Sequence, residues 1–291
     1  MSNNILAAIE PTDEGQHVWR VASRIAKQRK SNLSMINAIE PAVDIYADLS
    51  FTPLVECSSD WQQTLVNEHK AYFKRMANCL DSDTMSVKIA YPIHEIAGQA
   101  EAKDAELVVM GVHNRKGFGR LLGSTTHGVM NHCDRDILAV HPDSAEGPYQ
   151  RVLVAIDTTD VATTVAGKAA EIAGDAEVHV VSVMVPLTTV FAAPEAGRGL
   201  DWSFSELTKD ISRETKKKVE KTVSDAGFDP SIVNVATGDP RDEIIKAAEQ
   251  LKADLIVIGS NKRGPINRLL LGSTARSVLN QAPCDVLVCR A

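Results

Sequence analysis

The chain has 291 residues, of which 44% are hydrophobic and 24% are charged, and its formal net charge is −7. This length exceeds one typical core and suits two domains, and the composition is that of an ordinary globular protein. The negative charge argues against a general nucleic-acid binder, whose affinity would depend on basic side chains that neutralise phosphates.

No apolar run approaches the roughly 20 residues that span a bilayer, and the first residues, Met1–Ile5, lack the basic and apolar regions of a signal peptide. We therefore expect a cytoplasmic protein with no membrane partner. The five cysteines are odd in number and form no C-x-x-C pair, and no His-x3-His pair exists. Neither disulfides nor a metal site is expected.

The chain contains an internal duplication. Three pairs of segments match, at offsets of 147, 148 and 149 residues: Asn4–Asp13 with Arg151–Asp160, Pro92–Gly111 with Pro240–Gly259, and Gly123–Thr125 with Gly272–Thr274. A slow drift of the offset is typical of duplication followed by small changes in loop length. An internal repeat of this kind determines the interpretation of the whole fold.

Each copy predicts the same order of elements. A short aliphatic run predicts a buried first strand, and apolar residues at helical spacing predict an amphipathic helix after it. This helix is followed by a second strand, a variable insertion with a charged helix, and a third strand. Then come a helix that begins at a proline, a fourth strand, a loop, a last helix and a fifth strand. The expected strands are Ile5–Ile9, Leu33–Ile39, Val87–Ala90, Leu107–Met110 and Ile137–His141 in the first copy, and Val152–Ile156, Val178–Met184, Ile232–Ala236, Leu255–Ile258 and Val286–Arg290 in the second.

Strands that alternate with helices imply a parallel sheet covered on both faces. We therefore predict two tandem five-stranded α/β domains, residues 1–142 and 150–291, with a linker over residues 143–149. Seven extended residues reach at most about 25 Å, so the domains must be close neighbours. In such sheets, ligands bind beyond the carboxyl ends of the strands.

The loop after the fourth strand of the second copy is suited to a phosphate. It runs from Gly259 to a Gly272-Ser273-Thr274 triplet that opens the next helix. Backbone N–H groups at a helix start carry the positive end of the dipole, a glycine lets an anion approach, and the hydroxyls add donors. The alternative interpretation is an ordinary Ser/Thr helix cap.

The charge pattern favours an anion site. Between Leu255 and Cys284 there is no Asp or Glu, although the average acidic content of the chain would place about four there. The basic residues of that window are Lys262, Arg263, Arg268 and Arg276, and the acid-free window Leu107–Cys133 of the first copy holds Arg115, Lys116 and Arg120. A basic face that binds the neighbouring domain is the alternative.

Neither standard phosphate motif is present. The segment Gly259–Gly264 begins like a P-loop, but Pro265-Ile266 follows where Lys-Ser/Thr is required. Gly117-Phe118-Gly119 begins like a dinucleotide fingerprint, but leucine stands at position 122.

Essentially the whole chain resembles the tandem form of the universal stress protein family, which implies an adenine nucleotide α-hydrolase-like, Rossmann-type fold. Nucleotide-binding members of that family carry Gly-x2-Gly-x9-Gly-Ser/Thr after the fourth strand. Gly259, Gly272 and Ser273 occupy the outer positions of this motif, and Lys262 stands where the second glycine belongs. The resemblance also places Ala155 and Asp157, at the end of the first strand of the second copy, and Thr274 at the nucleotide. It implies that the backbone of Val183 binds the adenine edge. Gly238-Asp239-Pro240 matches a further element of the family.

The first copy departs further from the family pattern. Glu10 replaces the aspartate, Asn114 stands at the second-glycine position, and Ala90-Tyr91 replaces Gly238-Asp239. A phosphate could still bind near Gly111 and over Gly123, Ser124 and Thr125. We expect the second half to hold the better nucleotide site and the first half to be its degenerate partner.

The resemblance implies a stress-response regulatory protein that binds ATP with Mg²⁺, acts on an unidentified protein partner and has little or no catalytic activity. The alternatives are a nucleotide-free dimerisation or adaptor scaffold and, less favoured, a slow ATP hydrolase, for which no catalytic residue can be assigned from spacing. By the same resemblance, the two copies form an intrachain pseudo-dimer through their fifth strands. A homodimer of the whole chain is the other pairing considered.

Overall fold

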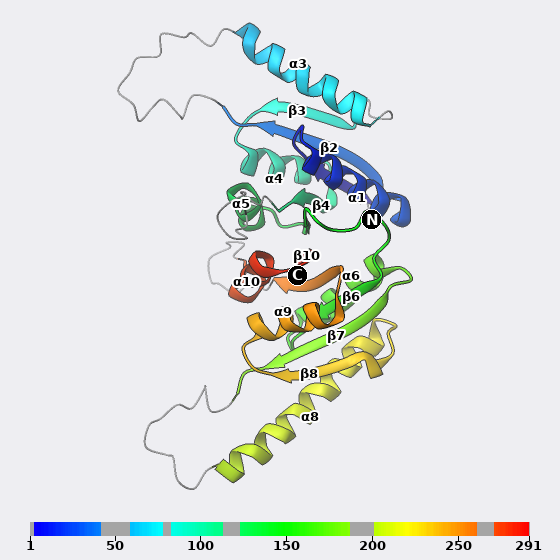
Figure 1. The fold of residues 1–291 in the computed structure, drawn as a ribbon, viewed down its shortest axis with the longest axis vertical. Helices are drawn as coiled ribbons and strands as arrows, with labels where there is room; N and C mark the ends of the chain where they lie inside the picture. Colours follow the sequence, from blue (N-terminus) through cyan, green and yellow to red (C-terminus); the bar gives the residue numbers. More distant parts are fainter. Residues whose placement is uncertain are drawn as a thin grey trace, which may run out of the picture. The chain divides into compact units, whose positions relative to one another are not determined.

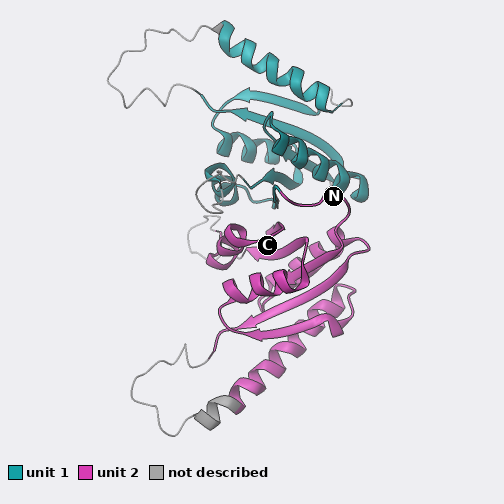
Figure 2. Cartoon of the chain, in the orientation of Figure 1, with its two compact units in different colours: residues 1–142 teal, residues 143–291 magenta. Residues whose placement is uncertain are grey.

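The computed structural model describes residues 3–41, 59–77, 83–112, 123–186, 201–260 and 271–290. The chain divides into unit 1, residues 1–142, and unit 2, residues 143–291, which Figure 2 shows in teal and magenta. Each unit is an α/β domain with a parallel five-stranded sheet, which confirms the fold class predicted from the duplication.

The sheet of unit 1 has the strand order β3-β2-β1-β4-β5. Its strands are β1 (Asn4–Ala8), β2 (Asn32–Ile39), β3 (Met85–Ile89), β4 (Ala105–Gly111) and β5 (Asp136–Val140), and its helices are α1 (Asp13–Arg29), α3 (Ser59–Met76), α4 (Pro92–Ala102) and α5 (Ser124–His132) (Figure 1). Strand β1 pairs with β2 on one side and with β4 on the other. The connections therefore reverse direction at β1, which makes its carboxyl end the switch point of the sheet.

The sheet of unit 2 repeats this arrangement in the order β10-β9-β6-β7-β8, with β6 between β7 and β9. Its strands are β6 (Arg151–Ala155), β7 (Glu177–Met184), β8 (Val233–Thr237), β9 (Leu255–Ser260) and β10 (Asp285–Arg290), and its helices are α6 (Val161–Ala173), α8 (Asp201–Asp225), α9 (Pro240–Leu251) and α10 (Ser273–Gln281). Each predicted strand of both units is present, with ends that differ by at most two residues.

The core of each unit is formed by side chains of the sheet and of the helices that pack on it. Leu6 and Val154, in the central strands, are fully buried, as expected for parallel strands with helices on both faces. Right-handed crossovers place α1 and α3 over one face and α4 and α5 over the other. Gln16 of α1 donates a 2.8 Å hydrogen bond to the Tyr72 hydroxyl of α3, which ties the first pair together. Within the described ranges, no helix is long and apolar enough to cross a membrane.

Side chains fix the beginning of unit 2. Tyr149, at the end of the predicted linker, is 5% exposed, and its hydroxyl donates a 2.8 Å hydrogen bond to Asp285 at the start of β10. The Asp254 carboxylate accepts hydrogen bonds from the backbone N–H groups of Gln150 (2.7 Å) and Arg151 (3.0 Å). The chain is therefore anchored within unit 2 before β6 begins.

The helices differ in how their first turns are capped. The Thr12 hydroxyl accepts a hydrogen bond from Gly15 N (3.1 Å) at the start of α1, and Asp239 caps α9 through Arg241 N (2.9 Å). Helices α5 and α10 begin after Gly123 and Gly272, and neither has a side-chain capping bond. Their first-turn N–H groups thus lack the usual side-chain acceptor.

We expect the substitution Gly15→Ala to destabilise unit 1. A Cβ at Gly15 would lie 2.0 Å from the backbone oxygen of Glu10, so the loop after β1 would have to move, at a cost of about 1–3 kcal/mol. The matched control is Gly167→Ala, within α6, where a Cβ meets nothing within 4 Å. That change should raise stability by about 0.5–1 kcal/mol. Denaturant unfolding followed by circular dichroism measures both, and a Gly15→Ala protein as stable as the wild type would contradict the expectation.

The cap of α9 should make part of the stability depend on pH. Hydrogen bonds from the Arg241 side chain and backbone lower the pKa of Asp239 from 3.8 to about 2. A carboxyl group with a lowered folded-state pKa contributes stability above its unfolded pKa and loses it as the pH falls toward the folded value. The Tm difference between wild type and Asp239→Asn should therefore be constant above about pH 5 and shrink between about pH 4 and pH 2. Asp175→Asn, at an exposed position after α6, is the control, and a difference that is independent of pH would show that the charge of Asp239 is not involved.

Candidate functional site

A cavity of ≈ 430 Å³ lies in unit 2 beyond the carboxyl ends of β6, β7 and β9. The volume falls in the range of about 300–1,000 Å³ that is common for small-molecule sites. Ile156 N donates a 3.0 Å hydrogen bond to Val181 O, so the chain continues beside β7 for one residue after β6 ends. The cavity thus occupies the switch point of the sheet, where ligands of such folds bind.

Asp157 stands at the rim of this cavity and is exposed. Its Oδ1 accepts hydrogen bonds from Thr159 N (2.9 Å) and from the Thr159 hydroxyl (2.5 Å). The carboxylate therefore stabilises the turn between β6 and α6. Both bonds use the same oxygen, so Oδ2 remains as an acceptor for a ligand hydroxyl.

Gly272 also lines the cavity, at the start of α10. Its backbone angles, φ −58° and ψ 152°, are open to any residue, and a Cβ built there would meet nothing within 4 Å. Among the described residues, neither backbone strain nor packing requires a glycine here. The N-cap of α10 is Gly272, which has no side chain, and Ser273 is the first residue of the helix.

Gly259, at the end of β9, is different. A Cβ at this position would lie 2.9 Å from methyl groups of both Val161 and Val165, so the approach of α6 to β9 accounts for the glycine. The two glycines that the sequence pairs thus have different roles in the structure. Gly259 allows close packing, and Gly272 leaves open space.

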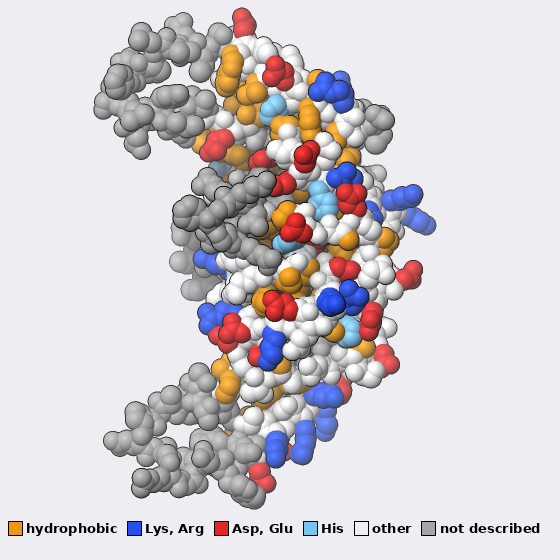
Figure 3. Space-filling view, in the orientation of Figure 1, with side chains coloured by type: hydrophobic (Ala, Val, Ile, Leu, Met, Phe, Trp, Pro, Cys, Tyr) orange, Lys and Arg blue, Asp and Glu red, His pale blue; other side chains and the backbone are white. Residues whose placement is uncertain are grey.

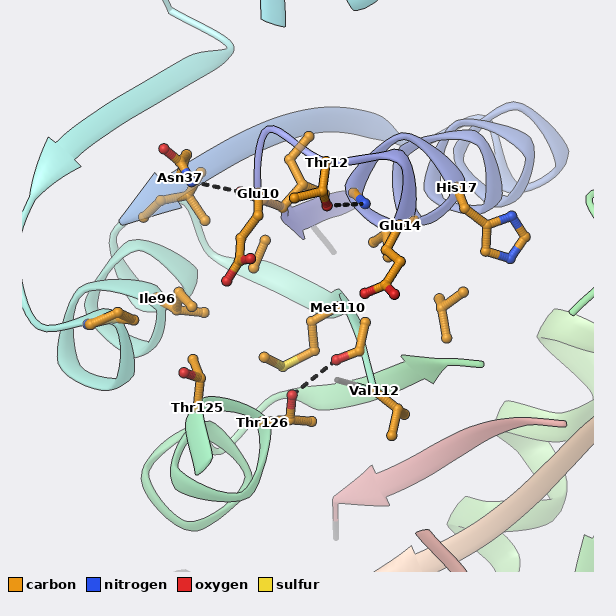
Figure 4. Close-up of a pocket in the computed structure, with 18 of the residues that line it drawn as sticks. Glu10, Thr12, Glu14, His17, Asn37, Ile96, Met110, Val112, Thr125 and Thr126 are labelled. Carbon is orange, nitrogen blue, oxygen red and sulfur yellow. Dashed lines mark hydrogen bonds between the residues drawn. The ribbon is translucent and has the colours of Figure 1, made fainter. Parts of the chain in front are cut away.

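The corresponding cavity in unit 1 is much smaller, at ≈ 70 Å³. Figure 4 shows the carboxylates of Glu10 and Glu14 directed into it from the loop after β1 and from α1. Glu14 corresponds to Val161 in the alignment of the two copies, so an apolar wall in unit 2 is acidic in unit 1. Two carboxylates oppose the binding of a phosphate.

Side chains also bind the strand ends of unit 1 to its helices. Asn37, which is 3% exposed, donates a 2.9 Å hydrogen bond to Ile9 O, and its Oδ1 lies 2.8 Å from His69 Nδ1 on α3. Burial lowers the pKa of His69, and the neighbouring Glu68 opposes this shift. At the start of α5, the Thr126 hydroxyl donates a 2.9 Å hydrogen bond to Gly111 O. These contacts hold the ends of β2 and β4 against neighbouring segments of unit 1.

The predicted site residues of the second copy come together in one place. The unit 2 cavity is lined by Ala155, Asp157, Val183, Gly259, Gly272, Ser273 and Thr274. In unit 1, Glu10, Gly111 and Thr125 line the cavity, whereas Gly123 and Ser124 begin α5 and are not among its lining residues. Lys262 and Asn114 lie outside the described residues.

Sequence reasoning missed the walls of both cavities. The apolar wall of unit 2 includes Val161 and Val165 from α6 and Ile244 from α9. An apolar side chain on a predicted helix carries no signal that distinguishes a cavity wall from the core. In unit 1, Glu14 follows Glu10 by four residues, and that spacing was the available signal for a second carboxylate.

Charged side chains are distributed differently on the surface and around the unit 2 cavity, whose described lining includes one charged side chain, Asp157. On the face in Figure 3, acidic and basic side chains are interspersed. No group of three or more His, Cys, Asp or Glu side chains that could hold a metal ion occurs within the described ranges. Next to the unit 2 cavity, Asp239 and Arg241 form an ion pair across the first turn of α9, and this pair lowers the pKa of the carboxyl group.

Comparison with known proteins identifies relatives of both units. A universal stress protein of Methanocaldococcus jannaschii is 36% identical over 148 residues, which cover 50% of this chain and 84% of that protein. A universal stress protein of Mycobacterium tuberculosis is 24% identical over 304 residues, which cover 99% of this chain and 97% of that protein. The solved structure of a universal stress protein from Archaeoglobus fulgidus superposes with a TM-score of 0.65 at 18% identity and covers 100% of this chain and 99% of that one.

The model of the universal stress protein family matches residues 1–141 and again residues 148–290. These two matches together span nearly the whole chain and coincide with the two halves of the internal duplication. The chain therefore belongs to the universal stress protein family and carries two of its domains in tandem.

Proposed function

We propose that this chain is an adenine-nucleotide-binding regulatory protein whose functional site is the unit 2 cavity. The observation that carries the proposal is the ≈ 430 Å³ cavity, whose lining includes both Asp157 and Gly272, the N-cap of a helix start without a side-chain capping bond. A nucleotide requires these two features, an acceptor for its sugar hydroxyls and donors for its phosphates. The equivalent cavity of unit 1 has ≈ 70 Å³ and two carboxylates, which supports a single site.

The residues have distinct roles in this proposal. Asp157 accepts hydrogen bonds from the ribose, and the Val183 backbone binds the adenine edge, as the family resemblance implies. Gly272, Ser273 and Thr274 hold the phosphates of ATP with their N–H and hydroxyl groups. Mg²⁺ would be held mainly by phosphate oxygens and water, because the described residues around the cavity include one carboxylate only.

The composition of the site favours binding over catalysis. Asp157 is the one titratable side chain among the described residues that line the cavity, and it already holds the turn after β6. A phosphate-transfer enzyme needs groups that position the nucleophile and stabilise the transition state. We infer that the nucleotide acts as a signal that alters contacts with a protein partner in the stress response. Pairing of the units through their fifth strands, homodimerisation and a cytoplasmic location remain predictions.

Two other functions, a nucleotide-free scaffold and an ATP hydrolase, can be distinguished from this proposal by experiment. Denatured protein should release adenine nucleotide at near one molecule per chain, as measured by mass spectrometry. If none is released and millimolar ATP leaves the Tm unchanged, the nucleotide-free scaffold is favoured instead. Rapid phosphate release that disappears in Asp157→Ala would favour a hydrolase.

Asp157→Ala should weaken ATP binding. Loss of a hydrogen bond to a charged group typically costs about 1.5–3 kcal/mol, which corresponds to about 10- to 100-fold in Kd. The matched control is Glu10→Ala, which removes the corresponding carboxylate of unit 1 and should leave the Kd unchanged. Isothermal titration calorimetry measures both variants, and equal losses in the two would place the site elsewhere.

Gly272→Ala should separate binding from stability. A methyl group at this position enters open space, so the Tm should stay within a degree or two of the wild-type value. The same methyl group occupies the path of a phosphate toward the α10 N–H groups, so ATP affinity should fall by at least about tenfold. Thermal unfolding and calorimetry on one preparation give both values. Wild-type affinity for ATP in this variant would exclude a phosphate at Gly272.

A further inference from the structure

A second cavity of ≈ 530 Å³ adjoins the proposed phosphate end of the nucleotide site. This groove is lined by Arg241, Leu271, Ser273, Arg276, Ser277 and Asn280. Leu271 and Ser273 line both cavities, so the groove begins where the nucleotide cavity ends. The groove lies between the start of α9 and one side of α10.

The polar residues of α10 form one stripe along this groove. Ser273, Arg276 and Asn280 are separated by three and four residues, which places them on the same helix face. Arg276 lies about 4.5 Å beyond Ser273 along the axis, and helical side chains lean toward the N-terminus of the helix. The Arg276 guanidinium can therefore reach a group that extends outward from Ser273.

The charge of the groove is positive. Arg276 is exposed, and among the described residues it has no ion-pair partner. Arg241 pairs with Asp239, which balances its charge, but Arg241 still lines the groove. No acidic residue occurs in α10 or between Leu255 and Cys284. Among the described residues that line the groove, the guanidinium of Arg276 is thus the charge without an opposite partner.

The same place in unit 1 is closed by an apolar contact. The residues that align with Arg241, Arg276 and Ser277 are Ile93, His127 and Gly128. A Cβ at Gly128 would lie 2.2 Å from Ile93 Cδ1, so Ile93 packs directly on the glycine. The fold therefore tolerates a filled groove without arginines. Packing does not require the polar lining of unit 2.

We propose that the groove is an anion subsite that receives the outer end of the phosphate chain of the nucleotide, with Arg276 as the residue that selects for chain length. The inference rests on the proposed function, because the chain enters from the nucleotide cavity past Ser273. A guanidinium binds phosphate oxygens through parallel N–H donors, which suits a terminal phosphate with two exposed oxygens. Unit 2 should then prefer nucleotides in the order adenosine tetraphosphate, ATP, ADP, AMP.

The test compares the wild type with Arg276→Gln by calorimetry, using AMP, ATP and adenosine 5′-tetraphosphate. The substitution should lower the affinity for ATP and the tetraphosphate by about tenfold and leave the affinity for AMP unchanged. The control is Arg213→Gln on α8, which removes another exposed guanidinium, one that lies outside the groove. It should change none of the three affinities.

The outcomes separate this inference from the proposed function. Equal losses for AMP and ATP, or no loss for either, would overturn the role of Arg276 while leaving the nucleotide site intact. If the wild type binds no adenine nucleotide, the proposed function fails, and inorganic tripolyphosphate then tests the groove by itself. Binding of tripolyphosphate that Arg276→Gln abolishes supports an anion subsite for free polyphosphate. No binding in the wild type excludes the subsite.

Discussion

The parallel pairing of a central strand with a neighbour on each side determines where the candidate ligand cavity of each unit lies and which residues line it. In unit 2, β6 pairs with β7 and β9, and all three strands end at one edge of the sheet. The chain leaves β6 toward β7, whereas β9 arrives on the other side, so no connection covers the end of β6. Asp157, Val183 and Gly272 meet there although they are far apart in the sequence.

Both units obey this constraint, but their side chains use the resulting space differently. In unit 1, Glu14 and Asn37 project into the crevice, and Ile93 closes the neighbouring groove over Gly128. In unit 2 the corresponding positions are Val161, Ser182 and Arg241. The backbone of the fold thus provides two potential sites. Side-chain volume and charge leave a cavity of useful size in unit 2 alone among the described parts of the chain.

The sequence alone was sufficient for the strands and for the strand-end and helix-start residues of the unit 2 cavity, but not for its apolar wall. Aliphatic runs and the drift of the repeat offset place each strand, because buried parallel strands tolerate few polar residues. The start of β3 was missed because Met85, which pairs with Met35, lacks the β-branched signal. The Asn37–His69 contact and the acidic wall of unit 1 were also missed, since they depend on how α1 and α3 pack. The start of α10 at Ser273, with Gly272 as its N-cap, depends on backbone geometry, which spacing does not reveal.

The bond between Tyr149 and Asp285 has a consequence for the order of biosynthesis. Its two partners lie at opposite ends of unit 2 and are 136 residues apart in the sequence. During translation the chain emerges from its N-terminus, and domains generally fold as units in that order. Unit 1 can complete its sheet while unit 2 is still being made, but the anchor that precedes β6 must wait for β10. The last strand of unit 2 to be synthesised is therefore the one that secures the first segment of that unit.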